Sequence, residues 1–316
     1  MVTVKAVSIK YQEKENQEMV GQYSLFSFME RIIKTLLSEG KVRTSETYSA
    51  ALKSFRQFRG GKDIMLDCLN VNVMKDFAEW HYDKGNTSNT VSFYARILRA
   101  VYNRAVDMEL IEDRRPFRHI YTGVAKTRKR ALPIEVIKRI RMLDLSCSPP
   151  LEFARDMFML SFYLRGMSFV DMALLRKRDL SGGYLVYRRR KTGAQMKIKW
   201  TVEMQTILKK YPGVNGYLLP VLTDEGNVNY LNYRRVGYKI TVNLKKIAAR
   251  VGLSAPLTLY VARHSWASIA KQQGVPIGVI SEGMGHRSEA TTQIYLASLD
   301  VTVVDKANDK ILKSLR

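Results

Sequence analysis

The first third of the chain is dominated by apolar residues at helical spacing. Between Ser24 and Gly40 they recur every three or four residues, which predicts a helix that ends before the glycine. Three further helices are predicted at about 44–59, 70–84 and 87–110. We expect Thr44 or Ser45 to cap the second of the four. Four helices with short connections favour a small bundle.

A basic connection leads to a second region with mixed patterning. The segment 122–133 contains a glycine and four cations, so we interpret it as a linker. Beyond it, helices are predicted at 134–144, 151–164, 202–210 and 232–251, with a break at Pro149-Pro150. Apolar alternation on both sides of Lys191-Thr192-Gly193 predicts a β-hairpin over 182–201. The fold class expected is mostly α with a small β-sheet.

The chain is strongly positive. Lysine and arginine total 52 against 29 acidic residues, which gives a formal net charge of +23. Because these cations are spread along the whole chain, they indicate a polyanionic partner. Nucleic acid is the first candidate and an anionic membrane surface the second. We expect no membrane-spanning segment, because no stretch of the sequence is long and apolar enough.

The two cysteines and the N-terminal residues indicate a cytoplasmic protein. Cys68 and Cys147 lie far apart and form no metal-ligand pattern, so we expect reduced, buried thiols. Residues 1–20 contain no apolar signal-peptide core. The sequence holds no complete phosphate-binding glycine loop and no metal-ligand cluster, so no cofactor is predicted.

The last quarter of the chain carries the residues with the most distinctive chemistry. Arg263 lies among apolar neighbours, and a buried arginine is costly unless an anion meets it. His286 follows Gly285, and Tyr295 comes nine residues later in a short segment predicted to be helical. An arginine, a histidine and a tyrosine close together suit attack on a phosphodiester. The phenol would be the nucleophile, and the cations would hold the phosphoryl oxygens.

At these positions the sequence resembles the tyrosine recombinases, also called the phage integrase family. That family has a histidine-x-x-arginine box, a leucine-glycine-histidine run, and a nucleophilic tyrosine nine residues after that histidine. The matching positions here are Tyr260, Arg263, His286 and Tyr295. Tyr260 departs from the family, which has histidine there. A phenol can donate a hydrogen bond, but it is a poor base near neutral pH because its reference pKa is about 10.

Two more residues acquire roles from this resemblance. The run at 163–180 resembles the family's first arginine box, but Ser168 occupies the strict arginine position. Arg165 is the predicted substitute, because a long side chain can span about 4.5 Å along a helix. The bland alternative is a structural pair between Arg165 and Asp171. This displaced arginine is similar to that of integrases and invertases of Bacteroidetes mobile elements.

Lys191 lies in the predicted hairpin turn and resembles the catalytic lysine of the family. There it would protonate the leaving 5′ oxygen as a general acid. The alternative is a surface lysine, because the hairpin carries many other cations.

The resemblance also implies a domain layout. Residues 21–121 resemble the helical, SAM-like core-binding domain, and 134–316 the α+β catalytic domain, with 1–20 a short N-terminal segment. The second and fourth predicted helices carry cations that face DNA phosphates or form a solvated face. They are Lys53, Arg56, Arg59, Arg96, Arg99 and Arg104. Residues 301–315 are predicted to form a final helix, which in the family docks on a neighbouring protomer.

The activity implied is that of a site-specific recombinase, which cuts and rejoins double-stranded DNA to integrate, excise or invert a segment. Tyr295 would form a 3′-phosphotyrosine, Arg263 and Arg165 would neutralise the phosphoryl charge, and His286 would bind a nonbridging oxygen. The phosphotyrosine conserves bond energy, so no cofactor is needed. A tetramer on DNA and accessory DNA-bending proteins are the partners that the resemblance implies.

Two other functions fit parts of the sequence. Residues 267–288 resemble the helix-turn-helix of DNA readers, so a DNA-binding regulator without cleavage stays open. A type IB topoisomerase-like enzyme would share the tyrosine and arginine chemistry. The four-helix region ahead of the catalytic one favours the recombinase over both.

Overall fold

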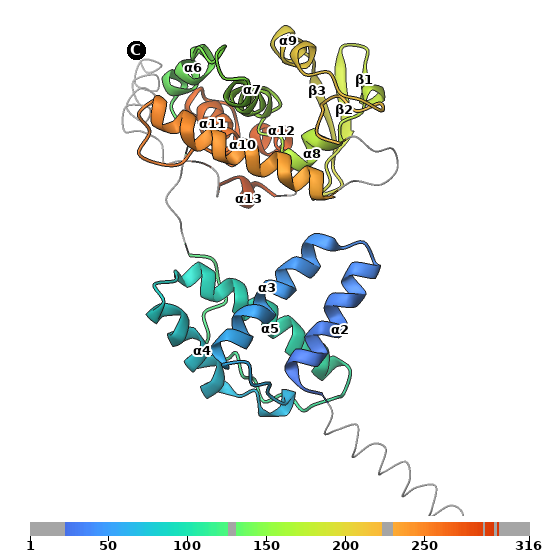
Figure 1. Cartoon of the computed structure of the whole chain (residues 1–316), viewed down its shortest axis with the longest axis vertical. Coiled ribbons are helices and arrows are strands. Elements are labelled where there is room, and N and C mark those ends of the chain that lie inside the picture. The colour runs from blue at the N-terminus through green and yellow to red at the C-terminus, as the bar shows by residue number, and fades with distance from the viewer. Residues whose placement is uncertain (1–22, 126–130, 223–229, 287, 294–295, 297–316) are drawn as a thin grey trace, which may run out of the picture. The chain divides into compact units, whose positions relative to one another are not determined.

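The computed structural model describes residues 23–125, 131–222, 230–286, 288–293 and 296. The chain divides into two compact units, Met1–Thr127 and Arg128–Arg316. Figure 1 colours the first from blue to teal and the second from green to red. Within the described residues the structure is mostly helical with one three-stranded sheet, which confirms the predicted fold class.

The described part of the N-terminal unit is a helical bundle. It contains α2 (Leu25–Ser38), α3 (Val42–Phe58), the short 3-10 helix η1 (Leu66–Cys68), α4 (Val71–Asp83) and α5 (Ser88–Asp107). Phe55, Phe77, Leu98 and Tyr102 form the centre of its core, and each is at most 1% exposed. The rings of Phe55 and Phe77 lie 5.1 Å apart. The four predicted helices are therefore present.

The start of α3 differs from the prediction. Its N-cap is Lys41, and Ser45 lies inside the first turn, where its hydroxyl donates to the carbonyl oxygen of Val42 at 2.7 Å. Gly40, with a φ of +70°, turns the chain, and the amide of Lys41 then donates to Leu36. This backbone turn starts α3 at Val42, ahead of the predicted caps Thr44 and Ser45.

The prediction of buried cysteines is wrong. Cys68, at the end of η1, and Cys147, ahead of the next unit's second helix, are both free and exposed. The neighbouring leucines occupy the core instead: Leu66 is 1%, Leu69 0% and Leu145 3% exposed. Competition from these larger apolar side chains leaves the thiols at the surface.

Hydrogen bonds fix both ends of the segment predicted as a linker. Near its start, the hydroxyl of Ser92 in α5 donates to the carbonyl oxygen of Gly123 at 2.5 Å. The side chain of Asn89 forms two bonds with the backbone of Ala125. Near its end, the amide of Leu132 donates to the hydroxyl of Ser265 at 2.8 Å. The residues between, 126–130, lie outside the described part of the chain.

The described part of the C-terminal unit combines helices with a small antiparallel sheet. Its first elements are α6 (Ile134–Met142), α7 (Pro149–Tyr163), α8 (Phe169–Leu174) and η2 (Lys177–Asp179). The strands are β1 (Leu180–Ser181), β2 (Tyr184–Arg188) and β3 (Gln195–Lys199), in the order β1-β2-β3. The remaining helices are α9 (Val202–Lys210), α10 (Tyr230–Arg250), α11 (Leu259–Gln272), α12 (Ile277–Gly283) and α13 (Glu289–Gln293).

The predicted hairpin is confirmed, while the predicted proline break is not a break. Strands β2 and β3 pair antiparallel, with Leu185 opposite Ile198 and Tyr187 opposite Met196. Pro149 and Pro150 form the first turn of α7 instead of separating two segments. Proline suits that position, because its fixed φ matches the helix and its missing N–H would have no partner there.

Helix α7 is the centre of the C-terminal unit. It packs against α6, α9, α10 and α11, and Figure 1 shows α10 as the long orange helix beside it. Met157 and Phe158 of α7, Leu244 of α10 and Ala262 of α11 are each 0% exposed. No helix in the described part of the chain is long and apolar enough to cross a bilayer.

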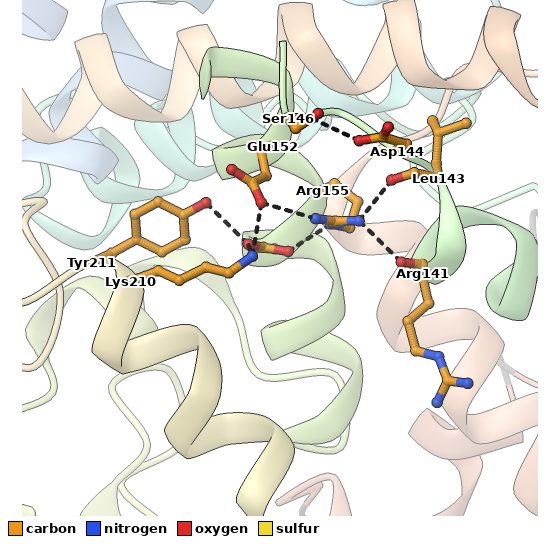
Figure 2. Close-up of polar contacts among 9 residues, drawn as sticks. Arg141, Leu143, Asp144, Ser146, Glu152, Arg155, Lys210 and Tyr211 are labelled. Carbon is orange, nitrogen blue, oxygen red and sulfur yellow. Dashed lines mark hydrogen bonds and ion pairs between the residues drawn. The ribbon is translucent and has the colours of Figure 1, made fainter. Parts of the chain in front are cut away.

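A buried arginine ties α7 to the end of α6. Arg155, 9% exposed, forms ion pairs with Asp156 and Glu152. Its Nη1 also donates to the carbonyl oxygens of Arg141 and Leu143, at 3.0 and 2.9 Å (Figure 2). These carbonyls end α6, so the guanidinium satisfies groups that the helix terminus leaves unbonded.

The same carboxylates receive groups from α9. Lys210 pairs with Glu152 at 2.7 Å and with Asp156 at 3.3 Å, and the Tyr211 hydroxyl donates to Asp156 at 3.0 Å (Figure 2). The hydrogen bond to Glu152 raises the pKa of Lys210. Burial, followed by the charge of Asp156, raises the pKa of Tyr211. The network joins three helices around the N-terminal half of α7.

Removing Arg155 should therefore weaken the C-terminal unit. We expect Arg155→Met to lower the free energy of unfolding by about 3–5 kcal/mol, because it takes the closest cation from the buried carboxylate of Asp156 and the donor from two carbonyls at the end of α6. Arg139→Met, on the exposed side of α6, is the control and should stay within about 0.5 kcal/mol of wild type. Urea unfolding monitored by tryptophan fluorescence measures both. A loss below about 1 kcal/mol for Arg155→Met would mean that the network acts as a surface pair does.

Candidate active site

Arg263 is held at the junction of three segments. It lies on α11 and is 5% exposed. Its Nη1 donates to the carbonyl oxygen of Gly166, after α7, at 2.8 Å. Its Nη2 donates to the carbonyl oxygen of Met284, after α12, at 2.8 Å. The predicted buried arginine is therefore real, and backbone carbonyls fix its guanidinium in one orientation.

His286 contacts Arg263 directly. Its Nε2 lies 2.7 Å from Nη2 of Arg263, and its Nδ1 lies 2.8 Å from the hydroxyl of Thr292 in α13. A guanidinium can only donate, so Nε2 accepts and Nδ1 carries the proton. Burial, followed by the charges of Arg263, Arg189 and Lys191, lowers the pKa of His286 to about 4. The imidazole is neutral at physiological pH in the absence of a bound anion.

The β2–β3 hairpin brings a cation that the sequence analysis missed. Arg189, just after β2, is 7% exposed, and its Nη1 donates to the carbonyl oxygen of Gly285 at 2.6 Å. The hydroxyl of Thr192 donates to the same oxygen at 3.3 Å. The alternation of side chains along β2 could have indicated that Arg189 points to the buried face. Leu185, Tyr187 and Arg189 point to one face, and the first of them is 0% exposed.

Lys191 lies in the turn of this hairpin, where its side chain is exposed. Its charge lowers the pKa of His286, so the two groups belong to one electrostatic environment. Arg263 and His286 are in direct contact, and the turn that carries Lys191 is held beside them by the hydrogen bond from Thr192 to Gly285.

Arg165 is positioned differently from the prediction. It follows the C-terminal end of α7 with a φ of +58°, so it does not lie on a helix with Ser168, and the argument from helical rise is wrong. The pair with Asp171 is absent from the described residues. Asp171 instead accepts from the Ser168 hydroxyl at 2.6 Å and from the amide of Arg190 at 2.9 Å. The Arg165 side chain passes Gly283, with its Cδ 3.7 Å from the position of a Cβ there.

The two predicted tyrosines differ in what the structure shows of them. Tyr260, at the start of α11, is 54% exposed, and its ring meets the edge of the His264 ring at a centroid distance of 4.5 Å. It lies one turn before Arg263 on the same helix. Tyr295 lies outside the described residues.

Two glycines let the segments of the site approach one another. Gly166 has a φ of +75°, and a Cβ there would lie 2.5 Å from the Cα of Arg263. Gly285 has a φ of +63°, and its Cβ would lie 2.7 Å from the sulfur of Met196 in β3. At Gly166 a side chain would collide with the backbone of Arg263, whereas at Gly285 it would displace the side chain of Met196; the positive φ disfavours a side chain at both positions.

The protonation of His286 gives one test. In the free protein its ring resonances should titrate near pH 4 rather than near the ordinary value of 6.5. Because the folded pKa is the lower one, the contribution to stability is complete above about pH 6.5 and is lost as pH falls toward 4. NMR of histidine-labelled protein measures the midpoint, with His286→Gln to assign the signal. A midpoint near 6.5 would contradict the buried geometry.

Two glycines with the same φ can be used to separate the stability cost of crowding from the cost of backbone conformation. Gly183, between β1 and β2, has the same φ of +75° as Gly166, but nothing lies within 4 Å of its Cβ position. Gly183→Ala should cost about 1–2 kcal/mol of unfolding free energy, from its left-handed conformation. Gly166→Ala should cost about 1–3 kcal/mol more, because it displaces Arg263. Equal losses in urea unfolding would show that the contact with Arg263 is not tight.

Comparisons with known proteins identify the family of the chain. The chain matches the family model for the phage integrase SAM-like domain over residues 24–120. It matches the model for the phage integrase family over residues 138–301. The second match includes every predicted site residue, and the two matches together span most of the chain.

Individual relatives point the same way. The chain is 28% identical over 257 residues to the tyrosine recombinase XerA of Thermococcus kodakarensis, which covers 75% of this chain and 86% of that protein. A 98-residue stretch is 32% identical to the tyrosine recombinase XerD of Brucella suis. This stretch covers 30% of this chain and 29% of that protein.

Solved structures share the fold. A lambda integrase dimer bound to a COC′ core site has a TM-score of 0.65 at 18% identity, over 86% of this chain and 95% of that chain. The Tn1549 transposon integrase in complex with a circular intermediate DNA has a TM-score of 0.62 at 16% identity, over 92% and 100%. The family predicted from the motifs is confirmed: the chain belongs to the phage integrase family and is a site-specific recombinase of the tyrosine type.

Proposed function

We propose that this enzyme cuts and rejoins double-stranded DNA through a 3′-phosphotyrosine intermediate. The observation that supports this most is the buried guanidinium of Arg263, fixed by two carbonyls and in contact with His286. A preorganised cation is what a phosphoryl group needs as its charge grows in the transition state. The outcome, whether integration, excision or inversion, belongs to the same proposal.

The proposed reaction uses each group once. The phenol of Tyr295 gives its proton to solvent as its oxygen attacks the scissile phosphorus, and the bond from phosphorus to the 5′ oxygen breaks. Lys191 gives a proton to that oxygen, so a 5′ hydroxyl leaves. Arg263 and Arg165 neutralise the phosphoryl oxygens. Attack by a 5′ hydroxyl on the phosphotyrosine reverses the steps and rejoins the DNA.

His286 and Tyr260 are assigned to nonbridging oxygens. In the free protein both ring nitrogens of His286 are engaged, by Arg263 and by Thr292. A bound phosphate offsets the surrounding cations and raises the pKa of the imidazole. His286 then donates Nε2–H to the phosphate in place of its contact with Arg263. Tyr260 is exposed and has a phenol that donates a hydrogen bond where the family has histidine.

The DNA partner is supported by charge and by the relatives. Lys53 in α3 and Arg96, Arg99 and Arg104 in α5 are exposed. Of the other predicted cations, Arg56 pairs with Glu30 at 2.8 Å, which weakens its assignment to phosphate. Lambda integrase has been solved as a tetramer bound to a Holliday junction. We propose that this chain also binds duplex DNA and assembles as a tetramer on it, with residues 24–120 as its core-binding domain.

Trapping of a covalent adduct tests this function. Wild type and Tyr295→Phe are incubated with nicked suicide DNA that carries candidate sites from the source element. We expect a slow-migrating, protease-sensitive adduct with wild type alone, because the phenylalanine has no nucleophilic oxygen. Tyr260→Phe removes the exposed phenol of α11, which is assigned to a nonbridging oxygen and not to attack, so this variant should form the adduct more slowly than wild type but still form it.

The opposite results are equally clear. If wild type and Tyr295→Phe both shift a proven target site but neither forms an adduct, the protein is a DNA-binding regulator. If Tyr260→Phe abolishes the adduct while Tyr295→Phe keeps it, the nucleophile has been assigned to the wrong tyrosine.

A further inference from the structure

The buried guanidinium groups of Arg189 and Arg263 donate to the carbonyl oxygens of two consecutive residues. Nη2 of Arg263 donates to the carbonyl oxygen of Met284 at 2.8 Å, and Nη1 of Arg189 donates to that of Gly285 at 2.6 Å. The next residue is His286. The two arginines come from different segments, one from α11 and the other from the residue after β2.

Arg189 forms no direct ion pair in the part of the chain that the structure describes. Its recorded partner is a neutral carbonyl. Asp171, a buried carboxylate that lines the same pocket as Arg189, accepts hydrogen bonds from the Ser168 hydroxyl and the Arg190 amide and forms no ion pair with Arg189. Burying a cation without a direct ion pair is costly. Such a cost is expected where an incoming anion completes the site.

We infer that Arg189 is a further phosphate-binding guanidinium of this recombinase, beside Arg263 and Arg165, and that it donates to a nonbridging oxygen of the same phosphodiester that Arg263 binds. The inference rests on the proposed function, since it assigns one more residue to that phosphoryl group. It also supplies a charge that the neutral hydroxyl of Ser168 cannot give.

The hairpin turn is built to deliver Arg189 together with Lys191. The amide of Arg189 donates to Ala194 at 2.8 Å, and the amide of Gly193 donates to Arg189 at 2.8 Å, which closes the turn around Lys191. One rigid turn therefore carries a phosphate ligand and, two residues later, the proposed proton donor. Because Arg189 and Thr192 both donate to the carbonyl oxygen of Gly285, the hairpin turn is held next to His286.

A plain structural role for Arg189 predicts something different. If the arginine only fastened the hairpin to Gly285, its loss would impair cleavage whatever the charge of the phosphate. If it neutralises the phosphoryl oxygens, its importance depends on that charge. A methylphosphonate replaces one nonbridging oxygen by a methyl group, so it removes the negative charge while keeping the bond that breaks.

The experiment compares adduct formation on suicide DNA that carries a phosphodiester or a methylphosphonate at the scissile position. The proteins are wild type, Arg189→Ala and the control Arg190→Ala. Arg190 is the next residue in the sequence and is exposed. On phosphodiester, Arg189→Ala should be slower than wild type by about 10²–10³-fold, as for loss of one oxyanion donor. On methylphosphonate most of that deficit should disappear. Arg190→Ala should behave as wild type on both.

Two results would overturn the inference. One is an Arg189→Ala rate equal to wild type on phosphodiester; the other is the same deficit on both substrates, which would leave only a fastening role. Absence of a wild-type adduct, or an adduct with Tyr295→Phe, would instead refute the proposed function. Thermal unfolding and a DNA shift confirm that Arg189→Ala is folded. If it is not, Arg189→Lys takes its place, because it retains the charge but loses the forked geometry.

Discussion

The site depends on how Arg263 is held. A guanidinium on α11 donates to a carbonyl oxygen after α7 and to another after α12, and it touches His286 as well. Three segments far apart in sequence are thereby fixed around one cation. Because the partners are neutral carbonyls, the arginine is oriented but keeps its charge available, which is what a phosphoryl group in a transition state requires.

The packing of helix α7 in the C-terminal unit supports this arrangement. Helix α7 ends at the loop that contains Gly166, and it packs against both α10 and α11. Its N-terminal half is held by Arg155 and Asp156, which join it to α6 and α9 (Figure 2). The ion-pair network lies at the other end of the helix from Gly166. It serves the site indirectly, by fixing the helix that presents the carbonyl to Arg263.

Close approach of backbones decides which side chains meet. Gly166 admits Arg263, and Gly285 admits the hairpin with Met196 and Arg189. Without a Cβ at these positions, two cations and an imidazole share a small volume, and each affects the others. The lowered pKa of His286 is the consequence, since burial and the neighbouring cations disfavour its charged form. In the proposed function a bound phosphate reverses that balance, which would link substrate binding to the protonation of His286.

The sequence by itself determined the elements and the family. Apolar periodicity located α2 to α5 and the hairpin, because it reports which face of a helix or strand is buried. The spacing of Arg263, His286 and Tyr295 identified the recombinase family. The sequence did not determine contacts that depend on packing. Competition with Leu66 and Leu69 exposed Cys68, the turn at Gly40 started α3 early, and the left-handed end of α7 redirected Arg165. Above all, Arg189 meets Gly285 across 96 positions of sequence. Only the tertiary structure decides such a meeting, because periodicity assigns a residue to a buried face but not to the neighbour that it finds there.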